Sequence, residues 1–150
     1  MSQREIWENE HRHSTVLPKM NEREAASGVK AFWAWVCERH YPRQTGLELG
    51  CGKGRNSIWL SGQGAEMTAF DFSENAVGEA RKRALEQNAK VSFLVHDATR
   101  PWPFASQSFD FGIDCFASTD IDSSSGRAFA RDEFKRVLKA GGLVRVHSFN

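Results

Sequence analysis

The sequence lacks any long apolar run. In its 150 residues no hydrophobic stretch approaches the roughly 18 residues that a membrane-spanning helix needs. Residues 1–13 are polar and charged, without the apolar segment of a secretory signal. We therefore expect no membrane partner and a cytoplasmic protein.

An excess of either charge and a metal-binding cysteine pattern are also missing. Lys and Arg number 20 and Asp and Glu number 19, so the net charge of +1 gives no electrostatic reason to expect a nucleic-acid partner. The three cysteines, Cys37, Cys51 and Cys115, form no Cys-x-x-Cys pair and no zinc spacing. The sequence therefore predicts no metal site, and the odd, widely separated cysteines indicate a reducing compartment.

No internal repeat or low-complexity segment divides the chain, and its length suits one domain. Residues 1–21 show no clean periodicity and contain Pro18, so we expect an N-terminal arm with a short helix around Arg4–Glu10. This arm could act as a lid that excludes water, with a frayed terminus as the alternative. The side chains that would form the lid are Trp7, His11 and His13. Residues 22–150 are the expected domain.

Short apolar runs alternate with helical patterns through the rest of the chain. Apolar side chains spaced by three and four predict a helix from Glu22 to about His40, with Asn21 as its N-cap. Strands are expected at Thr45–Gly50, Ala65–Phe70, Val91–Val95, Phe109–Phe116 and Leu143–Phe149. The later helices are expected at Asn56–Ser61, Glu74–Gln87 (after an N-cap at Ser73) and Arg127–Lys139 (ended by Gly141 and Gly142), and a proline-containing loop at Thr99–Ser108.

This alternation predicts an α/β protein with a Rossmann-like, doubly wound, mostly parallel sheet. Right-handed crossovers make 3-2-1-4-5 the expected strand order. In such sheets ligands bind outside the carboxyl ends of the strands, where the order switches between strands 1 and 4. That edge is where we look for functional side chains.

A glycine-rich turn, Gly50–Gly54, joins the first strand to the next helix, and Glu48 lies at the end of that strand. Glycine lets a backbone turn sharply and approach a ligand closely. The helix that follows presents unpaired N–H groups to a polar or negative ligand. A tight turn without a ligand is the alternative interpretation.

Two further acids follow the next two strands. Asp71 ends the second strand, 21 positions after Gly50, a spacing at which an acid can bind the ribose hydroxyls of an adenosine ligand. Phe72 could then pack against the base. Asp97 and Ala98 follow the third strand and could bind the adenine amine and a ring nitrogen. The alternatives are a helix N-cap for Asp71 and a solvated turn for Asp97.

The sequence resembles the class I S-adenosylmethionine-dependent methyltransferases in four segments: LELGCGKGRN, AFDFS, HDATRPWPFASQSFDFG and EFKRVLKAGGLV. Together they span about residues 44–148, and their order is specific to that class. The resemblance implies S-adenosylmethionine as cofactor and assigns a part of it to each segment. It places Glu48 and the Gly50, Cys51, Gly52 and Gly54 backbone on the methionine part, Asp71 on the ribose, Asp97 and Ala98 on adenine, and the backbone near Cys115 and Phe116 on the amino group.

Within that class, GCGKGRNSIWLS is similar to the tellurite-resistance and related small-molecule methyltransferases, which implies a small-molecule methyl acceptor. Arg55 and Asn56 could reach the cofactor carboxylate or a small anion, with helix capping and a surface ion pair as the alternative. No catalytic residue is predicted, because the candidate bases stand in no decisive pattern. These candidates are His11, His13, His96 and Asp120.

The chain departs from the class at its end. Class I enzymes usually continue after strand 5 with a helix and antiparallel strands 6 and 7, whereas this sequence stops at Asn150. Either the chain is a truncated fragment or the edge of strand 5 is covered by homo-oligomerisation. The competing functions are a non-catalytic cofactor-binding or interaction domain and, less favoured because Gly50–Arg55 departs from GxGxxG, an NAD-dependent dehydrogenase domain.

Overall fold

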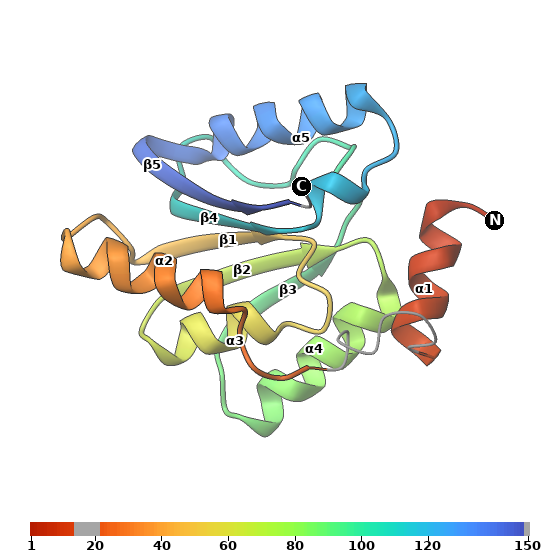
Figure 1. Ribbon diagram of the computed structural model, residues 1–150, viewed down its shortest axis with the longest axis horizontal. Helices are drawn as coiled ribbons and strands as arrows, with labels where there is room; N and C mark the ends of the chain where they lie inside the picture. Colours follow the sequence, from red (N-terminus) through yellow and green to blue (C-terminus); the bar gives the residue numbers. More distant parts are fainter. Residues whose placement is uncertain (14–21, 149–150) are drawn as a thin grey trace.

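A five-stranded parallel sheet forms the centre of the protein. The computed structural model describes residues 1–13 and 22–148, and its strands follow the order β3-β2-β1-β4-β5 (Figure 1). Every neighbouring pair is parallel. The strands are β1 (Thr45–Leu49), β2 (Glu66–Asp71), β3 (Val91–Val95), β4 (Phe109–Cys115) and β5 (Leu138–His147). The predicted fold class and strand order are therefore confirmed.

Helices cover both faces of this sheet (Figure 1). On one face lie α2 (Ser27–Glu38), α3 (Arg55–Gly62) and α4 (Glu74–Glu86), and on the other lies α5 (Ser124–Val137). Two further helices lie near the carboxyl ends of the strands: α1 (Gln3–His13) and the short 3-10 helix η2 (Ser118–Asp120). None of the helices in the described ranges is long and apolar enough to cross a membrane.

An aromatic cluster packs between α5 and the sheet face that this helix covers. The Trp102 ring lies 5.0 Å from Phe70 on β2 and 4.9 Å from Phe134 on α5, measured between ring centroids. Its indole Nε1 donates a hydrogen bond of 2.9 Å to the Ala98 carbonyl, so its one polar atom is satisfied in the core. The loop predicted at Thr99–Ser108 is therefore part of the core layer and holds the end of β3 against the sheet.

Several predicted boundaries are wrong for local reasons. The helix predicted from Glu22 begins at Ser27, because the Ala26 N–H donates to the Asn56 side chain and ends the extended segment there. The proposed N-cap, Asn21, lies outside the described residues. The helix predicted at Arg4–Glu10 exists but is longer, covering the whole of α1.

The last helix and strand also differ from the prediction. Helix α5 begins three residues early, at Ser124, because the Ser123 hydroxyl caps it by accepting from the Gly126 N–H. It ends at Val137 and passes directly into β5. Gly141 and Gly142 thus lie inside β5, in the part where its register with β4 shifts.

Candidate functional site

The glycine-rich turn adopts a backbone that few other residues tolerate. Gly50, Gly52 and Gly54 have φ angles of 64°, 53° and 85°, in the left-handed region. A Cβ on Gly50 would lie 2.2 Å from the Ala117 Cβ, and one on Gly54 would lie 2.8 Å from the Phe93 ring. The turn is therefore pressed against β3 and against the segment after β4, where the strand order switches.

Glu48 holds this turn to the helices around it. Its carboxyl group is almost fully buried and accepts hydrogen bonds from Asn56 Nδ2 (3.0 Å) and Ser57 Oγ (2.5 Å), both in the first turn of α3. Asn56 Oδ1 in turn accepts from the Ala26 N–H at the start of α2, over 2.9 Å. Burial raises the Glu48 pKa to about 7, against the opposing effect of these hydrogen bonds. Asn56 therefore connects β1, α3 and α2.

Asp71 joins the turn to the end of β2. Its carboxylate accepts from the Gly52 N–H and from the Ser73 N–H, each over 2.9 Å, and it is 7% exposed. Burial raises the Asp71 pKa, although these two hydrogen bonds oppose that change. The α4 N-cap is Ser73, whose hydroxyl accepts from the Ala76 N–H, so Asp71 does not serve as the cap. Phe72, partly buried, lies between these two residues.

Asp97 lies exposed just after β3. The His96 N–H donates to the Asp71 carbonyl over 2.9 Å, which keeps this segment beside the end of β2. Asp97 Oδ1 accepts from the Thr99 N–H (2.9 Å) and the Thr99 hydroxyl (2.7 Å) and so closes a turn. The solvated-turn interpretation describes this geometry, and an exposed carboxylate at this point is also available to a ligand.

The end of β4 contains an acid that the sequence analysis missed. Asp114 is 3% exposed, and its Oδ1 accepts from the Ala117 and Ser118 N–H groups, each over 3.0 Å. Burial raises its pKa. The signal was an acid near the carboxyl end of a strand that is apolar at most other positions. Beside it, Phe116 has a φ of 66°, and its N–H donates to the His147 carbonyl on β5 over 3.0 Å.

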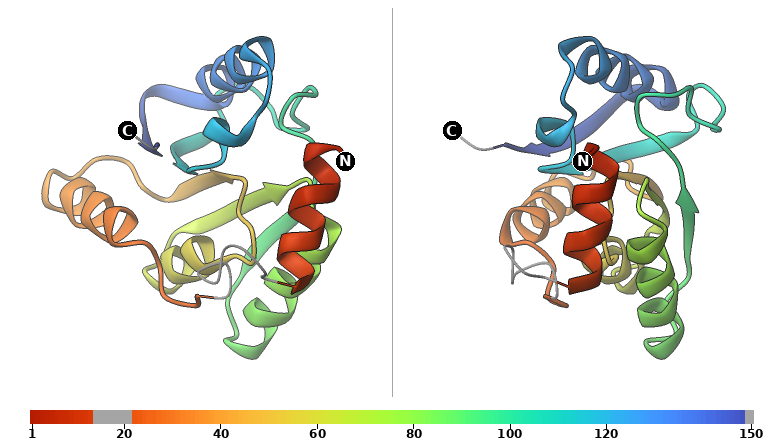
Figure 2. Two further views of the ribbon diagram at one scale, coloured as in Figure 1. Left: turned by 45° about the vertical axis from the view of Figure 1, so that its right-hand side comes forward. Right: turned by 90° about the vertical axis from the view of Figure 1, so that its right-hand side faces the viewer.

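Helix α1 lies over the same edge, beside α4 (Figure 2). The Glu8 carboxylate accepts from the Glu74 N–H over 2.7 Å and from both the backbone and the side chain of Asn75. These are groups of the first turn of α4, where a negative charge is favoured. Gln3 Nε2 donates to Asp122 beyond η2 over 2.8 Å. The predicted arm thus includes a docked helix.

His11 faces the glycine turn from α1. A Cβ placed on Gly52 would have the His11 ring as its neighbour, at 3.5 Å. Burial, together with the nearby Lys53 charge, lowers the His11 pKa to about 4. Its Nδ1 is buried and has no hydrogen-bond partner among the described residues. An unpaired buried nitrogen of this kind often indicates a bound molecule or water.

The predicted site residues therefore meet along one edge of the sheet, at the carboxyl ends of β1 to β4. Arg55 is the exception, because its guanidinium pairs with Glu22 over 2.9 Å in the surface ion pair weighed as the alternative. This edge combines a backbone turn without side chains, buried and exposed carboxylates, and the unpaired His11 nitrogen. Such a donor and acceptor set fits a ligand that bears hydroxyl and amino groups. No group of metal-ligating side chains occurs within the described ranges.

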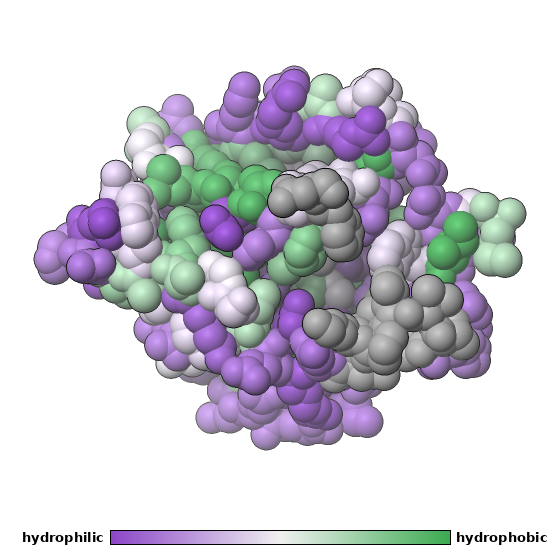
Figure 3. Space-filling view, in the orientation of Figure 1, coloured by the Kyte–Doolittle hydropathy of each residue, from purple (hydrophilic) through white to green (hydrophobic). Residues whose placement is uncertain are grey.

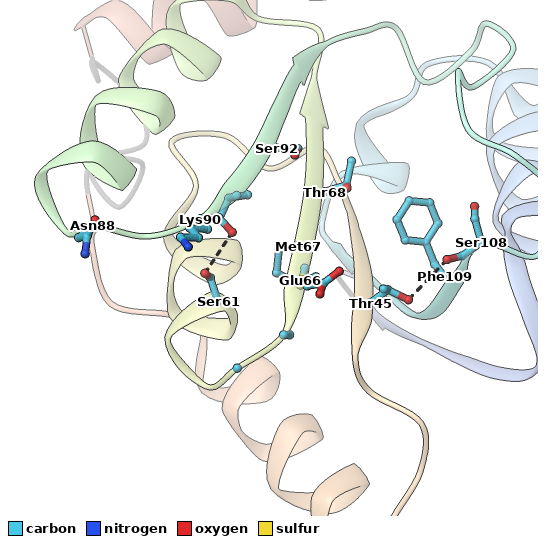
Figure 4. A pocket seen from close by; sticks show the side chains of 13 residues that line it. Thr45, Ser61, Glu66, Met67, Thr68, Asn88, Lys90, Ser92, Ser108 and Phe109 are labelled. Atoms are coloured by element: carbon cyan, nitrogen blue, oxygen red, sulfur yellow. Dashed lines mark hydrogen bonds between the residues drawn. The ribbon is translucent and has the colours of Figure 1, made fainter.

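An open hollow lies at the opposite edge of the sheet (Figure 4). This open pocket of about 670 Å³ is lined by the amino ends of the strands and by the loops that enter them. Two of its hydroxyl groups are engaged with the backbone of the pocket: Ser61 Oγ donates to the Lys90 carbonyl, and Thr45 Oγ1 to the Ser108 carbonyl. The functional side chains lie at the carboxyl edge, and we take that edge as the site.

Known proteins share both the sequence pattern and the fold. A family model described as "Methyltransferase domain" matches residues 47–142. A demethylmenaquinone methyltransferase of Clavibacter sepedonicus is 35% identical over 105 residues, which are 69% of this chain and 40% of that protein. A Haemophilus influenzae protein named "Probable S-adenosyl-L-methionine-dependent methyltransferase TehB" is 37% identical over 51 residues, 34% of this chain and 18% of that one.

The fold is also similar to that of a solved structure. The crystal structure of the PH0226 protein from Pyrococcus horikoshii superposes with a TM-score of 0.73 at 25% identity, over 87% of this chain and 62% of that one. The chain spans half or less of the length of these curated relatives, 40% and 18%. Residues 47–142, which the family model matches, contain the glycine turn, Asp71 at the end of β2 and Asp97 after β3.

We predict that Glu48 makes stability depend on pH. Because its pKa is raised in the folded state, its contribution is complete below about pH 4.5 and is lost as the pH rises through about 7. Glu48→Gln, which cannot ionise, should remove a fall of on the order of 2–3 kcal/mol in unfolding free energy across this range. Urea unfolding at pH 5 and pH 8 measures it. Equal pH dependence in both proteins would show that Glu48 is ionised throughout.

Proposed function

This chain belongs to the methyltransferase domain family, and we propose that it binds S-adenosylmethionine at the carboxyl edge of its sheet and methylates a small molecule. The observation that carries the proposal is that Glu48 and Asp71 hold the left-handed Gly50–Gly54 turn at the carboxyl edge, with Asp97 following the neighbouring strand at the same edge. An NAD-dependent dehydrogenase is disfavoured by the family match and by the GxGxG spacing.

Each part of the edge has a distinct binding task in this proposal. Asp71 would receive the ribose hydroxyls, since each carboxylate oxygen can accept a second hydrogen bond beside the one from the backbone. Asp97 and Ala98 would meet adenine, with Phe72 against its ring. The Gly50, Cys51, Gly52 and Gly54 backbone, with Glu48 and Asn56 beneath it, would hold the methionine part. Cys115 and Phe116 would meet its amino group.

When bound, S-adenosylmethionine supplies a methyl group already activated by its positive sulfur. The protein therefore has to position the acceptor, orient it and exclude water. The Clavibacter relative is named for a small-molecule acceptor, demethylmenaquinone, and this supports a small-molecule acceptor here.

We propose that residues 22–150 form the catalytic domain and that residues 1–21 act as its lid. The support is that α1 docks on the first turn of α4 through Glu8 and covers Gly52 with His11. A cofactor that enters beside Asp71 and Gly52 has to displace this helix or pass beneath it. The helix can then exclude water once the cofactor is bound.

The cell compartment and the binding partners of the protein form a separate part of the proposal. We propose that it acts in the cytoplasm without nucleic-acid or membrane partners. Its three cysteines are free thiols, and its formal net charge is +1. We also propose that a second copy covers β5, which pairs with β4 alone in the described sheet. Hydrophobic side chains gather over the β4–β5 region in Figure 3, and Val146 is 51% exposed.

Two substitutions test the cofactor site. Asp71→Ala should weaken S-adenosylmethionine binding by about 1–3 kcal/mol, because the ribose hydroxyls lose buried partners. Asp97→Ala should relax the preference for adenine over other bases and alter affinity less. Isothermal titration calorimetry measures both, with the exposed Asp132→Ala as a matched control. Unchanged affinity in both variants, with the control also unchanged, would show that the site lies elsewhere.

The lid should open as the pH falls. His11 has a lowered pKa when docked, so docking is complete above about pH 6.5 and weakens as the pH falls toward about 4. Hydrogen exchange of the α1 amides, corrected for intrinsic rates, should rise between pH 7.5 and 5 in the wild type. In His11→Gln that rise should disappear. If the wild type and the variant respond alike, His11 does not control docking.

The β5 edge can be tested through the oligomeric state. Val146→Lys places a charge on the exposed apolar edge and should convert a dimer into a monomer, because a buried unpaired charge opposes association. Light scattering after size exclusion measures the mass, with Leu85→Lys as a control at an exposed apolar position on α4. A wild-type protein that is monomeric at high concentration would contradict the proposal.

A further inference from the structure

The half-buried carboxyl group of Asp120 lies in η2, directly after the end of β4. Helix η2 is held against that end: the Thr119 hydroxyl donates to the Phe116 carbonyl over 2.7 Å, and the Asp120 N–H donates to the Ala117 carbonyl over 3.1 Å. Ala117 is also the residue that a Cβ on Gly50 would strike. Asp120 therefore lies one short helical turn from Ala117, the residue that packs against the turn assigned to the methionine part in the proposed function.

The strand order decides where the methyl acceptor has to lie. In the proposed function adenine lies at β3, ribose at β2 and the methionine part at β1, so the transferred methyl group follows toward β4. An in-line displacement requires the acceptor on the far side of the methyl group from the sulfur. The segment after β4 is the part of the chain next to that position.

The carboxylates of Asp120 and Asp114 differ in their hydrogen-bond partners. Asp114 is clamped by two backbone N–H groups, whereas the Asp120 carboxylate has no hydrogen bond or ion pair within the described part of the chain. Asp114 on β4 is the charged side chain that acts on it, through like-charge repulsion. Burial and this repulsion raise the Asp120 pKa, which strengthens it as a base.

The histidines near the edge are less suited to accept a proton. The Nδ1 atom of His147, on β5, is buried. Its Nε2 atom packs against Gly28, where a built Cβ would lie 1.9 Å from it, and accepts from Arg145 Nε over 3.4 Å. His11 has its pKa lowered to about 4, far from neutral pH. His96 lies on the adenine side, at the end of β3, and His13 is exposed at the end of α1.

We propose that Asp120 accepts the proton of the methyl acceptor, and that the acceptor is a hydroxyl or amine compound whose reacting oxygen or nitrogen is neutral, rather than an oxyanion. This inference rests on the proposed function. In the step, a lone pair of the acceptor's oxygen or nitrogen forms the bond to the methyl carbon. The carbon–sulfur bond breaks with its electron pair kept by sulfur, and the acceptor's proton passes to the Asp120 carboxylate. Two acids at this end of the edge would repel an anionic acceptor.

The test uses two ligands and needs no known acceptor. S-adenosylhomocysteine lacks the methyl group, whereas sinefungin carries an amine where the methyl group lies. An ammonium group at that point should hydrogen-bond to an ionised Asp120. We expect Asp120→Asn to reduce the preference for sinefungin over S-adenosylhomocysteine by about tenfold or more, the scale of a hydrogen bond to a charged group. Affinity for S-adenosylhomocysteine should stay within about twofold.

The pH dependence gives a second readout. In the wild type the preference for sinefungin should increase as the pH rises and Asp120 ionises, and in Asp120→Asn this increase should be much smaller, since Asp114 is then the one acid of this pair left to ionise. Asp132→Asn, at an exposed acid on α5 outside the site, is the control and should behave as the wild type. Removing a charge beside Asp114 relieves repulsion, so Asp120→Asn should fold, and its S-adenosylhomocysteine affinity verifies that it does.

The other outcomes overturn the proposal in distinguishable ways. A wild-type sinefungin preference in Asp120→Asn shows that Asp120 does not face the methyl group. An equal loss in Asp132→Asn shows a general effect of surface charge instead of a specific contact. A loss in His147→Gln alone assigns the role to His147. If the wild type binds neither ligand, the proposed function itself fails, and this inference fails with it.

Discussion

The rest of the site depends on the hydrogen bonds of the buried Glu48 carboxyl group. It receives hydrogen bonds from Asn56 and Ser57, and Asn56 passes the connection to Ala26 at the start of α2. One side chain at the end of β1 therefore sets the positions of α3 and α2 and, between β1 and α3, of the glycine turn. Burying an acid is costly unless its oxygens are paired, and here both oxygens have partners.

The parallel sheet brings other acids to the same edge as Glu48. Because all carboxyl ends point to one edge, Asp71, Asp97 and Asp114 meet there although they are far apart in sequence. The Gly52 N–H bond to Asp71 then ties the turn to β2. Helix α1 covers the same edge through Glu8 and His11. It therefore shields the polar groups of this edge from part of the solvent.

The sequence was sufficient for the features that depend on periodicity and backbone chemistry. Apolar spacing identified all five strands, and the Gly50–Gly54 turn with Asp71 and Asp97 located the edge. It could not locate boundaries set by tertiary contacts, such as the start of α2 at Ser27, which depends on the distant Asn56 side chain. Asp114 was missed for the same reason: its partners are loop N–H groups that only the folded turn presents. The docking of Glu8 on α4 also joins segments 66 positions apart.

A crystal structure with S-adenosylhomocysteine bound tests the central claim most directly. The account predicts that the ribose hydroxyls lie on Asp71, that adenine lies beside Asp97 and that the sulfur lies above the Gly50–Gly54 turn, facing the end of β4. The ligand bound at the opposite edge, or at the carboxyl edge with its adenosine turned toward β5, would contradict it.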